Sequence, residues 1–293
     1  AAEVLQDAVR KLAGEGGARL SLAGAQSKLP VVLVDGQVAV PLPGQPSTHL
    51  IKPEPDRFAG LAANEAFCLA LARAVGLDVV ECEWREASER PYILVTRYDR
   101  AGEGGTVRRL HQEDFAQALG VPSNRKYAAE GGPVFRDCFA LLREATARPA
   151  REVLKLVDAA IFNVIIGNAD AHAKNFSLLR QEGAGSPIVL APLYDLVATV
   201  MWAELSPRFA MTFGGAATLE QLDAKHFDRF SADAGIAAPF VRRRAGELAA
   251  AISAAIDRGL EVQGLYEQEA AAMLGEAIRD RAGRVALKAG ARS

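Results

Sequence analysis

The stretch IIGNADAHAKNFSLL (residues 165–179) places a polar loop between two apolar segments. Four side chains that can carry chemistry lie close together in it, namely Asp170, His172, Lys174 and Asn175. A polar loop held between buried elements is a common place for catalytic and binding groups. The alternative is an Asx-rich turn whose side chains only satisfy their own backbone. The loop is therefore a candidate site, and the surrounding sequence must decide between these interpretations.

Asp170 and Asn175 stand at the D-x-x-x-x-N spacing that is typical of a kinase catalytic loop. In such a loop the Asp orients or deprotonates the acceptor hydroxyl, and the Asn gives an oxygen to Mg²⁺. Further along, PLYDLVAT places Asp195 between apolar neighbours. A buried carboxylate needs a partner, and a metal ion shared with Asn175 would supply one. A capping Asp at a helix start is the alternative for Asp195.

Two further segments upstream fit the same chemistry. Lys52 lies in the predicted strand THLIKPEP, and Glu65 follows on a helix predicted from Phe58 to Val75. A strand Lys paired with a helix Glu holds ATP phosphates in kinases, although a surface ion pair is the alternative. The segment SLAGAQSK (21–28) has small residues that let backbone N–H groups approach phosphates, or it is an ordinary hairpin turn.

The rest of the chain divides into a β-rich part and a helical part. Alternating apolar residues and turn signals predict two strand pairs before the glycine-rich segment 101–107, the first of them a hairpin that turns at Asp35-Gly36. Helical periodicity dominates after that segment. We expect domains at 1–104 and 105–293, with a cleft between them. The predicted strands are Leu29–Val34, Gln37–Val40, Val79–Trp84, Tyr92–Tyr98, Phe176–Leu179 and Ile188–Leu190, and the predicted helices are Glu113–Leu119, Phe135–Ala145, Arg151–Ile166 and much of 218–288.

Composition excludes several classes of protein. The 293 residues include 34 Lys+Arg and 36 Asp+Glu, a net charge of −2, so the chain has no bulk attraction to nucleic acid or anionic membrane. Half of the residues are hydrophobic, which argues against disorder, yet no apolar run approaches the about 20 residues of a membrane span. Cys68, Cys82 and Cys138 lack the spacing of a zinc site or disulfide framework. We expect a cytoplasmic protein.

The order of these parts resembles a known family. A phosphate-type loop, strand Lys, helix Glu, strand pair, glycine linker, D-x-x-x-x-N loop and later Asp follow one another as in a two-lobed kinase. The segments SLAGAQSKLP, THLIKP, NEAFCLALARAVGL, TRYDR, HQEDFAQALGVPSNRKYAAEGGP, GNADAHAKNFS and PLYDLVAT resemble motifs of the HipA-like serine/threonine kinases, the toxins of bacterial HipA–HipB modules. The resemblance spans most of the chain.

The resemblance implies an α+β, bilobal protein-kinase-like fold related to the phosphoinositide kinases, with a β-rich N-lobe and an all-helical C-lobe. It implies that Asp170 is catalytic, that Asn175 and Asp195 hold Mg²⁺, and that Lys52 binds the ATP phosphates. Ser21 falls at the autophosphorylated loop serine, where a phosphate would repel ATP and expel the loop. The other nucleotide-binding residues that it implies are Ala23, Gly24, Ala25, Gln26, Ser27, Lys28, Thr96, Arg97, Tyr98, His172, Ala173, Lys174, Asn175, Tyr194 and Asp195.

The family's biology gives further expectations. The resemblance implies an ATP- and Mg²⁺-dependent toxin of a type II toxin–antitoxin system that phosphorylates an aminoacyl-tRNA synthetase, glutamyl-tRNA synthetase or another. That reaction would inhibit translation and promote dormancy and persistence. The partner would be a HipB-like helix-turn-helix antitoxin, with DNA contacted only through it, and no membrane. Family members carry an N-terminal subdomain that is largely missing here, which suggests a trimmed chain or a short toxin with a separate N-terminal partner.

Two alternatives remain open at this point. One is a kinase of the same fold that acts on a lipid or small molecule, and the other is a non-catalytic pseudokinase that acts as co-repressor with a DNA-binding antitoxin. Two surface features are equally open. Arg242, Arg243 and Arg244 either contact operator DNA or form a solvated helix face. Lys126 and Tyr127 either line the substrate face or have a structural role.

Overall fold

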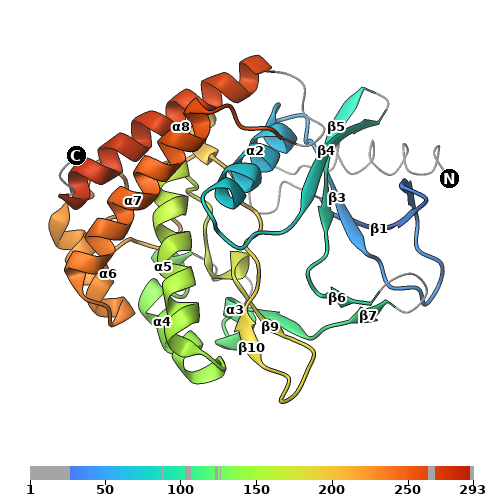
Figure 1. The fold of residues 1–293 in the computed structure, drawn as a ribbon, viewed down its shortest axis with the longest axis horizontal. Helices are drawn as coiled ribbons and strands as arrows, with labels where there is room; N and C mark the ends of the chain where they lie inside the picture. The colour runs from blue at the N-terminus through green and yellow to red at the C-terminus, as the bar shows by residue number, and fades with distance from the viewer. Residues whose placement is uncertain are drawn as a thin grey trace.

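The computed structural model describes residues 27–87, 89–102, 107–122, 125, 127–262 and 268–290. A β-sheet lies on one side of the molecule and a group of long helices on the other, with α2 between them (Figure 1). Ser21, Ala23–Gln26 and Lys126 lie outside the described residues, as do most of the glycine-rich segment and the expected domain boundary at 104/105. That boundary stays a prediction.

An antiparallel sheet forms the β-rich part. Its strands run in the order β2-β1-β3-β5-β4, and each pair is antiparallel. The strands are β1 (Leu29–Val34), β2 (Gln37–Ala39), β3 (His49–Pro53), β4 (Cys82–Ala87) and β5 (Arg90–Thr96), and a short ribbon of β6 (Arg100–Ala101) and β7 (Arg108–Arg109) follows.

The first hairpin matches its sequence signal. Asp35 and Gly36 have φ angles of 51° and 75°, which a two-residue type I′ turn requires at both central positions. Val34 therefore pairs with Gln37. The predicted hairpin is confirmed.

Helix α2 (Leu61–Ala74) joins the sheet to the helical part. Phe67, Leu69 and Leu71 are buried in one continuous core with Ile93 and Val95 of the sheet. The helix also contacts α7 (Ala238–Asp257) and α8 (Gln268–Ala289) on its other side. Because α2 is buried from two directions, Glu65 in its second turn is only 1% exposed, which is unusual for a carboxylate.

Helix α5 (Pro149–Ile166) is the centre of the helical part. It packs against α4 (Phe135–Ala145), α7 and α8, and α6 (Ala224–Ala234) completes the layer (Figure 1). Burial of nearly the whole second half of α5 explains why its sequence is apolar on all sides. A cluster of aromatic rings closes the core between α4 and α6: Phe135, Phe139, Phe213, Phe227 and Phe230.

The C-terminal part is mainly helical rather than wholly so. The strands β8 (Gln112–Asp114), β9 (Ser177–Arg180) and β10 (Ile188–Leu190) form a small antiparallel sheet beside α5. The helix predicted over 113–119 is accordingly shorter, because Glu113 and Asp114 pair with β9. Only α3 (Phe115–Ala118) remains helical, and Asp114 caps it through a bond from the Gln117 N–H.

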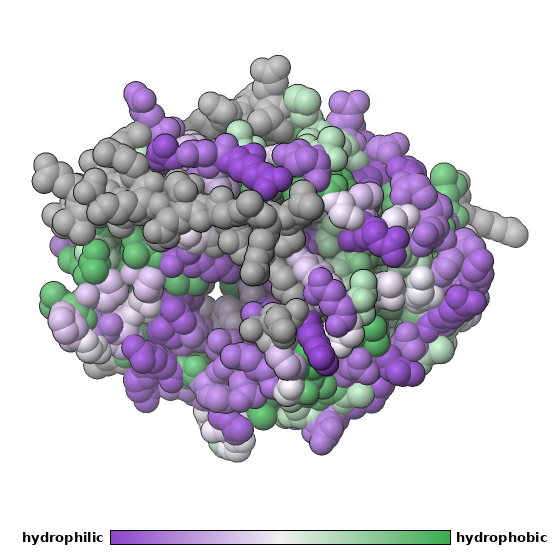
Figure 2. All heavy atoms as spheres, turned by 180° about the vertical axis from the view of Figure 1, so that it is seen from behind, coloured by the Kyte–Doolittle hydropathy of each residue, from purple (hydrophilic) through white to green (hydrophobic). Residues whose placement is uncertain are grey.

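The surface seen from behind carries mostly hydrophilic side chains, with small apolar patches between them (Figure 2). Within the described residues, no helix combines the length and apolar character that crossing a membrane requires. Cys68, Cys82 and Cys138 are all free thiols.

Candidate active site

The polar loop begins where α5 ends at Gly167. This residue has a φ of 75°, the left-handed conformation that closes many helices. A Cβ at this position would lie 2.6 Å from one methyl of Val200 and 2.9 Å from Nε of Arg281. Glycine is therefore required here by both the backbone conformation and the space around it.

Arg281 of α8 satisfies the carbonyl groups that α5 leaves unbonded at its C-terminus. Its Nε donates to the Ile165 carbonyl at 3.0 Å, and its Nη2 donates to the Val164 carbonyl at 2.9 Å. A cation at this end also complements the helix dipole. Burial lowers the pKa of Arg281 to about 10, so the guanidinium stays charged at neutral pH. Two distant segments thus fix the start of the loop.

Asn168 links three parts of the site. Its Nδ2 donates to Oδ1 of Asn163 at 2.8 Å and to the Asp195 carbonyl at 3.2 Å, and its Oδ1 accepts from the Asp170 N–H at 3.1 Å. The loop is also held by Thr199, whose Oγ1 donates to the Gly167 carbonyl at 2.9 Å. Sequence reasoning missed Asn168, because in sequence it looks like one more Asx residue of a turn. Its buried position, 3% exposed, gives it this role.

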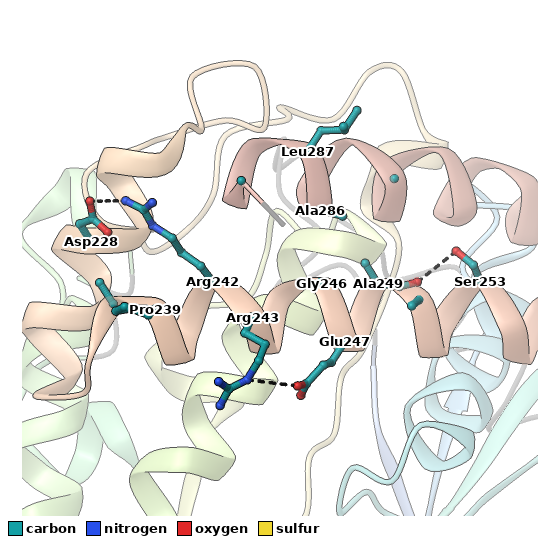
Figure 3. Close-up of a pocket in the computed structure, with 14 residues that line it drawn as sticks. Asp228, Pro239, Arg242, Arg243, Gly246, Glu247, Ala249, Ser253, Ala286 and Leu287 are labelled. Carbon is teal, nitrogen blue, oxygen red and sulfur yellow. Dashed lines mark hydrogen bonds and ion pairs between the residues drawn. The ribbon is translucent and has the colours of Figure 1, made fainter. Parts of the chain in front are cut away.

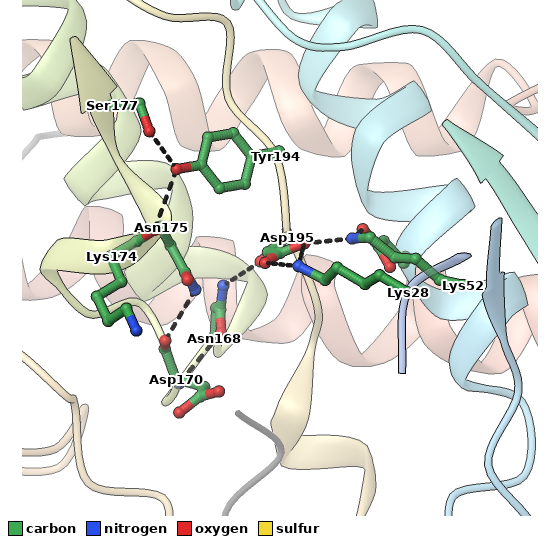
Figure 4. Close-up of polar contacts among 10 residues, drawn as sticks. Lys28, Lys52, Asn168, Asp170, Lys174, Asn175, Ser177, Tyr194 and Asp195 are labelled. Atoms are coloured by element: carbon green, nitrogen blue, oxygen red, sulfur yellow. Dashed lines mark hydrogen bonds and ion pairs between the residues drawn. The ribbon is translucent and has the colours of Figure 1, made fainter. Parts of the chain in front are cut away.

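Asp170 and Asn175 lie together in the loop, as their spacing predicted. The Asn175 Nδ2 donates to the Asp170 carbonyl at 3.0 Å (Figure 4). A short 3₁₀ turn, Ala173–Asn175, folds the chain back so that the two residues come into contact. The Asp170 carboxylate accepts a hydrogen bond at 2.8 Å from the hydroxyl of Tyr127. His172 is buried beneath the loop at 4% exposed.

Asp195 faces two lysine side chains from the sheet side (Figure 4). Lys28, just before β1, approaches its Oδ2 at 3.0 Å, and Lys52 of β3 contacts its Oδ1. Lys52 also forms an ion pair with Glu65 of α2. The predicted strand Lys, helix Glu and later Asp therefore meet at one ammonium group, which is 3% exposed. The alternative of a surface pair is wrong.

The charged groups of this cluster shift one another's pKa values. Burial would lower the pKa of Lys52, but Asp195 and Glu65 outweigh it and raise that pKa. Burial would raise the pKa of Asp195, yet Lys28 and Lys52 together hold it well below its usual range. Burial raises the pKa of Glu65, which has only Lys52 as a direct cationic partner among the described residues. The two lysines therefore keep the Asp195 carboxylate ionised, so its oxygens stay anionic at neutral pH.

The segment expected to contact adenine crosses between the two parts at Thr96, Arg97 and Tyr98. The Arg97 guanidinium donates two hydrogen bonds to the Asp99 carboxylate, at 2.9 and 2.8 Å. These two nitrogen atoms are therefore bonded within the segment that links the two parts. The Tyr98 ring stacks on Tyr194, with centroids 5.7 Å apart.

Tyr194 ties this link to the polar loop. Its hydroxyl donates to the Lys174 carbonyl at 3.0 Å and shares a hydrogen bond of 2.6 Å with Ser177 (Figure 4). Burial raises the pKa of Tyr194 well above its ordinary value. The structure thus brings Tyr98, Tyr194 and Lys174 together, and Ser27 and Lys28 directly precede β1.

Asn175 and Asp195 carry the amide and carboxylate oxygens that Mg²⁺ takes as ligands. In the part of the chain that the structure describes, no group of three or more His, Cys, Asp or Glu side chains could hold a metal alone. Mg²⁺ needs no such group, because it usually takes one or two protein oxygens together with phosphates and water. The two lysine cations on Asp195 show that its carboxylate accepts positive charge at both oxygens.

A groove of about 1030 Å³ lies away from this site, between α7 and α8 (Figure 3). Arg242 and Arg243 of the basic cluster line this groove, and Arg244 follows them in the chain. Arg242 pairs with Asp228, Arg243 with Glu247, and Arg244 makes bonds of 2.7 and 2.9 Å to Asp158. These pairs neutralise the cluster, which favours the solvated helix face over a DNA contact.

Comparison with known proteins places this geometry in a family. A family model described as the HipA-like C-terminal domain matches residues 20–256. "Putative kinase Y4mE" of Sinorhizobium fredii is 54% identical over 251 residues, which are 85% of this chain and 59% of that protein. "Serine/threonine-protein kinase toxin HipA" of Shewanella oneidensis is 30% identical over 210 residues, 67% of this chain and 47% of that protein. The chain thus spans about half the length of these relatives.

Solved structures show the same fold. A chain of the Shewanella oneidensis complex of HipA, HipB and operator DNA matches with a TM-score of 0.87 and 25% identity, over 100% of this chain and 74% of that chain. The Helicobacter pylori proinflammatory kinase CtkA, at 14% identity, matches with a TM-score of 0.59 over 96% and 95% of the two chains, which concerns the fold alone. The predicted bilobal, kinase-like α+β fold is confirmed.

The sequence motifs, the buried Lys52 between Glu65 and Asp195, and a family match over most of the chain agree with one another. This chain belongs to the family of HipA-like C-terminal domains.

Proposed function

We propose that the protein is an ATP- and Mg²⁺-dependent serine/threonine protein kinase. One observation carries the proposal: the buried ammonium group of Lys52 forms an ion pair with Glu65 of α2, as the phosphate-binding lysine of a kinase does, and lies against Asp195. The pairing spans three separate segments of the chain and is buried, so it serves as more than a surface charge pair. The kinase names of the curated relatives support the same activity.

In the proposed reaction the oxygen of a serine hydroxyl attacks the γ-phosphorus of ATP. The bond from that phosphorus to the β-phosphate oxygen breaks, ADP leaves, and Asp170 accepts the hydroxyl proton. Bound Mg²⁺ would neutralise phosphate charge, held by Asn175 and Asp195. Lys52 and Lys28 would turn from Asp195 to the phosphates, because an ammonium group pairs equally well with phosphate oxygens. Catalysis would come from positioning and charge neutralisation.

The nucleotide would lie between the sheet and the polar loop. The segment Ala23–Lys28 would cover the phosphates, Thr96 to Tyr98 would meet the adenine, and His172 to Asn175 and Tyr194 would complete the pocket. Ser21 would be the autophosphorylated residue. Under this proposal the domain boundary lies at 104/105, between the part that covers the nucleotide and the part that carries Asp170.

The biological role follows from the Shewanella oneidensis relative, which is named a toxin and was solved with HipB and operator DNA. We infer a toxin that is restrained by a HipB-like antitoxin and reaches DNA only through it. Its substrate would be an aminoacyl-tRNA synthetase in the cytoplasm, whose phosphorylation slows translation and promotes persistence. These roles are proposed for the whole protein, because the chain spans only about half the length of its curated relatives.

Intact mass before and after incubation with Mg-ATP tests the proposal. The chain is first treated with phosphatase, so that phosphate acquired during expression does not hide a gain. We expect one added phosphate on Ser21 in the wild type and none in Asp170→Asn. Asp158→Asn is the matched control, because Asp158 pairs with Arg244 outside the site and its loss should leave the gain intact.

An unchanged mass in a wild-type chain that still binds ATP would refute the autophosphorylation and favour the pseudokinase co-repressor. A gain of equal size in Asp170→Asn would show that Asp170 is not the catalytic residue. A gain located elsewhere than Ser21 would leave the kinase activity standing and overturn the autophosphorylation site.

A further inference from the structure

Tyr127 lies on the connection between α3 and α4, far in sequence from the polar loop. The next residue fixes its backbone: the Ala128 N–H donates to the Ala210 carbonyl at 3.0 Å. The Ala210 N–H in turn donates to the Ala169 carbonyl at 3.0 Å, next to Asp170. The segment that carries Tyr127 is therefore tied through Ala210 to the loop that carries Asp170.

The side chain of Tyr127 completes this connection. Its hydroxyl donates to Oδ1 of Asp170 at 2.8 Å, and its ring meets the ring of His172 edge-on, with centroids 5.7 Å apart and planes at 65°. Because His172 is buried, its ring holds the Tyr127 ring against a part of the molecule that is closely packed. Backbone, ring and hydroxyl all place the phenol against one oxygen of the Asp170 carboxylate.

We propose that Tyr127 is a positioning residue for Asp170: its hydroxyl fixes the rotamer of the carboxylate and so aims the carboxylate at the acceptor hydroxyl. This inference rests on the proposed kinase function. A carboxylate has two oxygens and about four lone-pair sites, so a bond to Oδ1 leaves it able to accept the substrate proton. A hydrogen bond to an ionised group is stronger than one between neutral groups, which makes it an effective restraint.

The Tyr127 hydroxyl donates to Asp170 as an acceptor hydroxyl would, which allows a second interpretation of the contact. The phenol could occupy the place of the acceptor hydroxyl and block it. The backbone bonds argue against this, because a blocking residue must leave and Tyr127 is held through Ala128 and Ala210 to the loop itself. The two interpretations predict opposite effects of removing the hydroxyl.

The test compares the wild type with Tyr127→Phe, which loses the hydroxyl and keeps the ring beside His172. Tyr92→Phe is the matched control, because Tyr92 is buried in the small β-sheet cluster of Val31, Ile51 and Leu94 and is outside the proposed site. Phosphatase-treated chains receive Mg-[γ-³²P]ATP, and transfer to protein and to water is followed against ATP concentration. Binding of the fluorescent analogue mant-ATP gives nucleotide affinity, and Tm gives stability.

We expect kcat for transfer to fall roughly ten- to hundredfold in Tyr127→Phe, as for a misplaced catalytic group. KM for ATP and the Kd for mant-ATP should stay within about twofold of the wild type, because only the chemical step uses the carboxylate. Tyr92→Phe should match the wild type in all three. An unchanged kcat in Tyr127→Phe overturns the proposal. A raised kcat also overturns it and assigns Tyr127 to the acceptor's place, and a joint loss of Tm and nucleotide affinity assigns it a structural role.

A thermal cycle reports the contact independently of activity. Tm is measured for Tyr127→Phe, Asp170→Ala and the double variant, and the double loss should be smaller than the sum of the two single losses. Additive losses would overturn the coupling. A wild type that transfers no phosphate to protein or water while binding mant-ATP refutes the kinase function, and the cycle still decides whether Tyr127 restrains Asp170.

Discussion

Replacing Gly167 with alanine tests whether close packing at the end of α5 fixes the polar loop. The new Cβ would lie 2.6 and 2.7 Å from the two methyls of Val200 and 2.9 Å from Nε of Arg281. It would also occupy a φ of 75°, where L-residues with a side chain are disfavoured. Gly76 provides a matched control, because its φ is 84° and a Cβ added there would have no neighbouring atom within 4 Å.

The expected losses differ because only one of the two glycines is crowded. Both substitutions cost about 1 to 2 kcal/mol for the left-handed backbone. Gly167→Ala adds about 1 to 3 kcal/mol for overpacking. At about 2 °C per kcal/mol for a chain of this size, Tm should fall by about 2 to 4 °C for Gly76→Ala and by about 4 to 10 °C for Gly167→Ala.

Differential scanning calorimetry measures these shifts, and the intact-mass assay with Mg-ATP measures their effect on function. The Gly167 variant should transfer phosphate poorly at a temperature where it is fully folded, since its loop must move away from Val200. The Gly76 variant should transfer at the wild-type rate. Equal Tm losses in the two variants would refute the packing argument, and normal transfer by Gly167→Ala would refute its link to the loop.

Two further predictions concern the Lys52 cluster. Lys52→Met leaves the buried carboxylate of Glu65 without its cation and should lower the free energy of unfolding in urea by about 3 to 5 kcal/mol. Adding Glu65→Gln should recover part of that loss, and no recovery would contradict the buried pair. Because the pKa of Asp195 is depressed in the folded state, its stabilisation is present above its unfolded pKa of about 4 and is lost as the pH falls below that value. The fall in urea midpoint between pH 6 and pH 3 should therefore be smaller in Asp195→Asn than in the wild type, and identical falls would show that the ion pairs contribute nothing.

Local chemistry explains what could be predicted from the sequence. The Asp35-Gly36 turn is set by two residues that tolerate positive φ, and the spacing of Asp170 and Asn175 is set within one loop. Lys52 and Glu65 could be paired because a strand and the helix after it form one local unit. The contact of Lys52 with Asp195 was not predicted, since no local rule connects positions 143 residues apart, and the resemblance assigned Asp195 to Mg²⁺ with Asn175.

Long-range contacts explain what could not be predicted. Asn168 gains its role only when Asp195 and the end of α5 come together around it. The bond from Tyr127 to Asp170 joins residues that no pattern relates, and the sequence left the place of Tyr127 undecided. The short α3 shows the same limit, because pairing with β9 overrides a helical period at Glu113.

The Arg281 contact has a consequence for where this kind of domain ends. The family match stops at residue 256, whereas α8 begins at Gln268, so the guanidinium that completes α5 comes from outside the matched region. A chain cut after residue 256 would keep every motif and still expose two carbonyl groups directly before Gly167. The part of the chain that supports the loop thus extends beyond the part that the family model matches. Helix α8 therefore supports the polar loop from more than 110 positions away in the chain, although it contributes no residue to the proposed site.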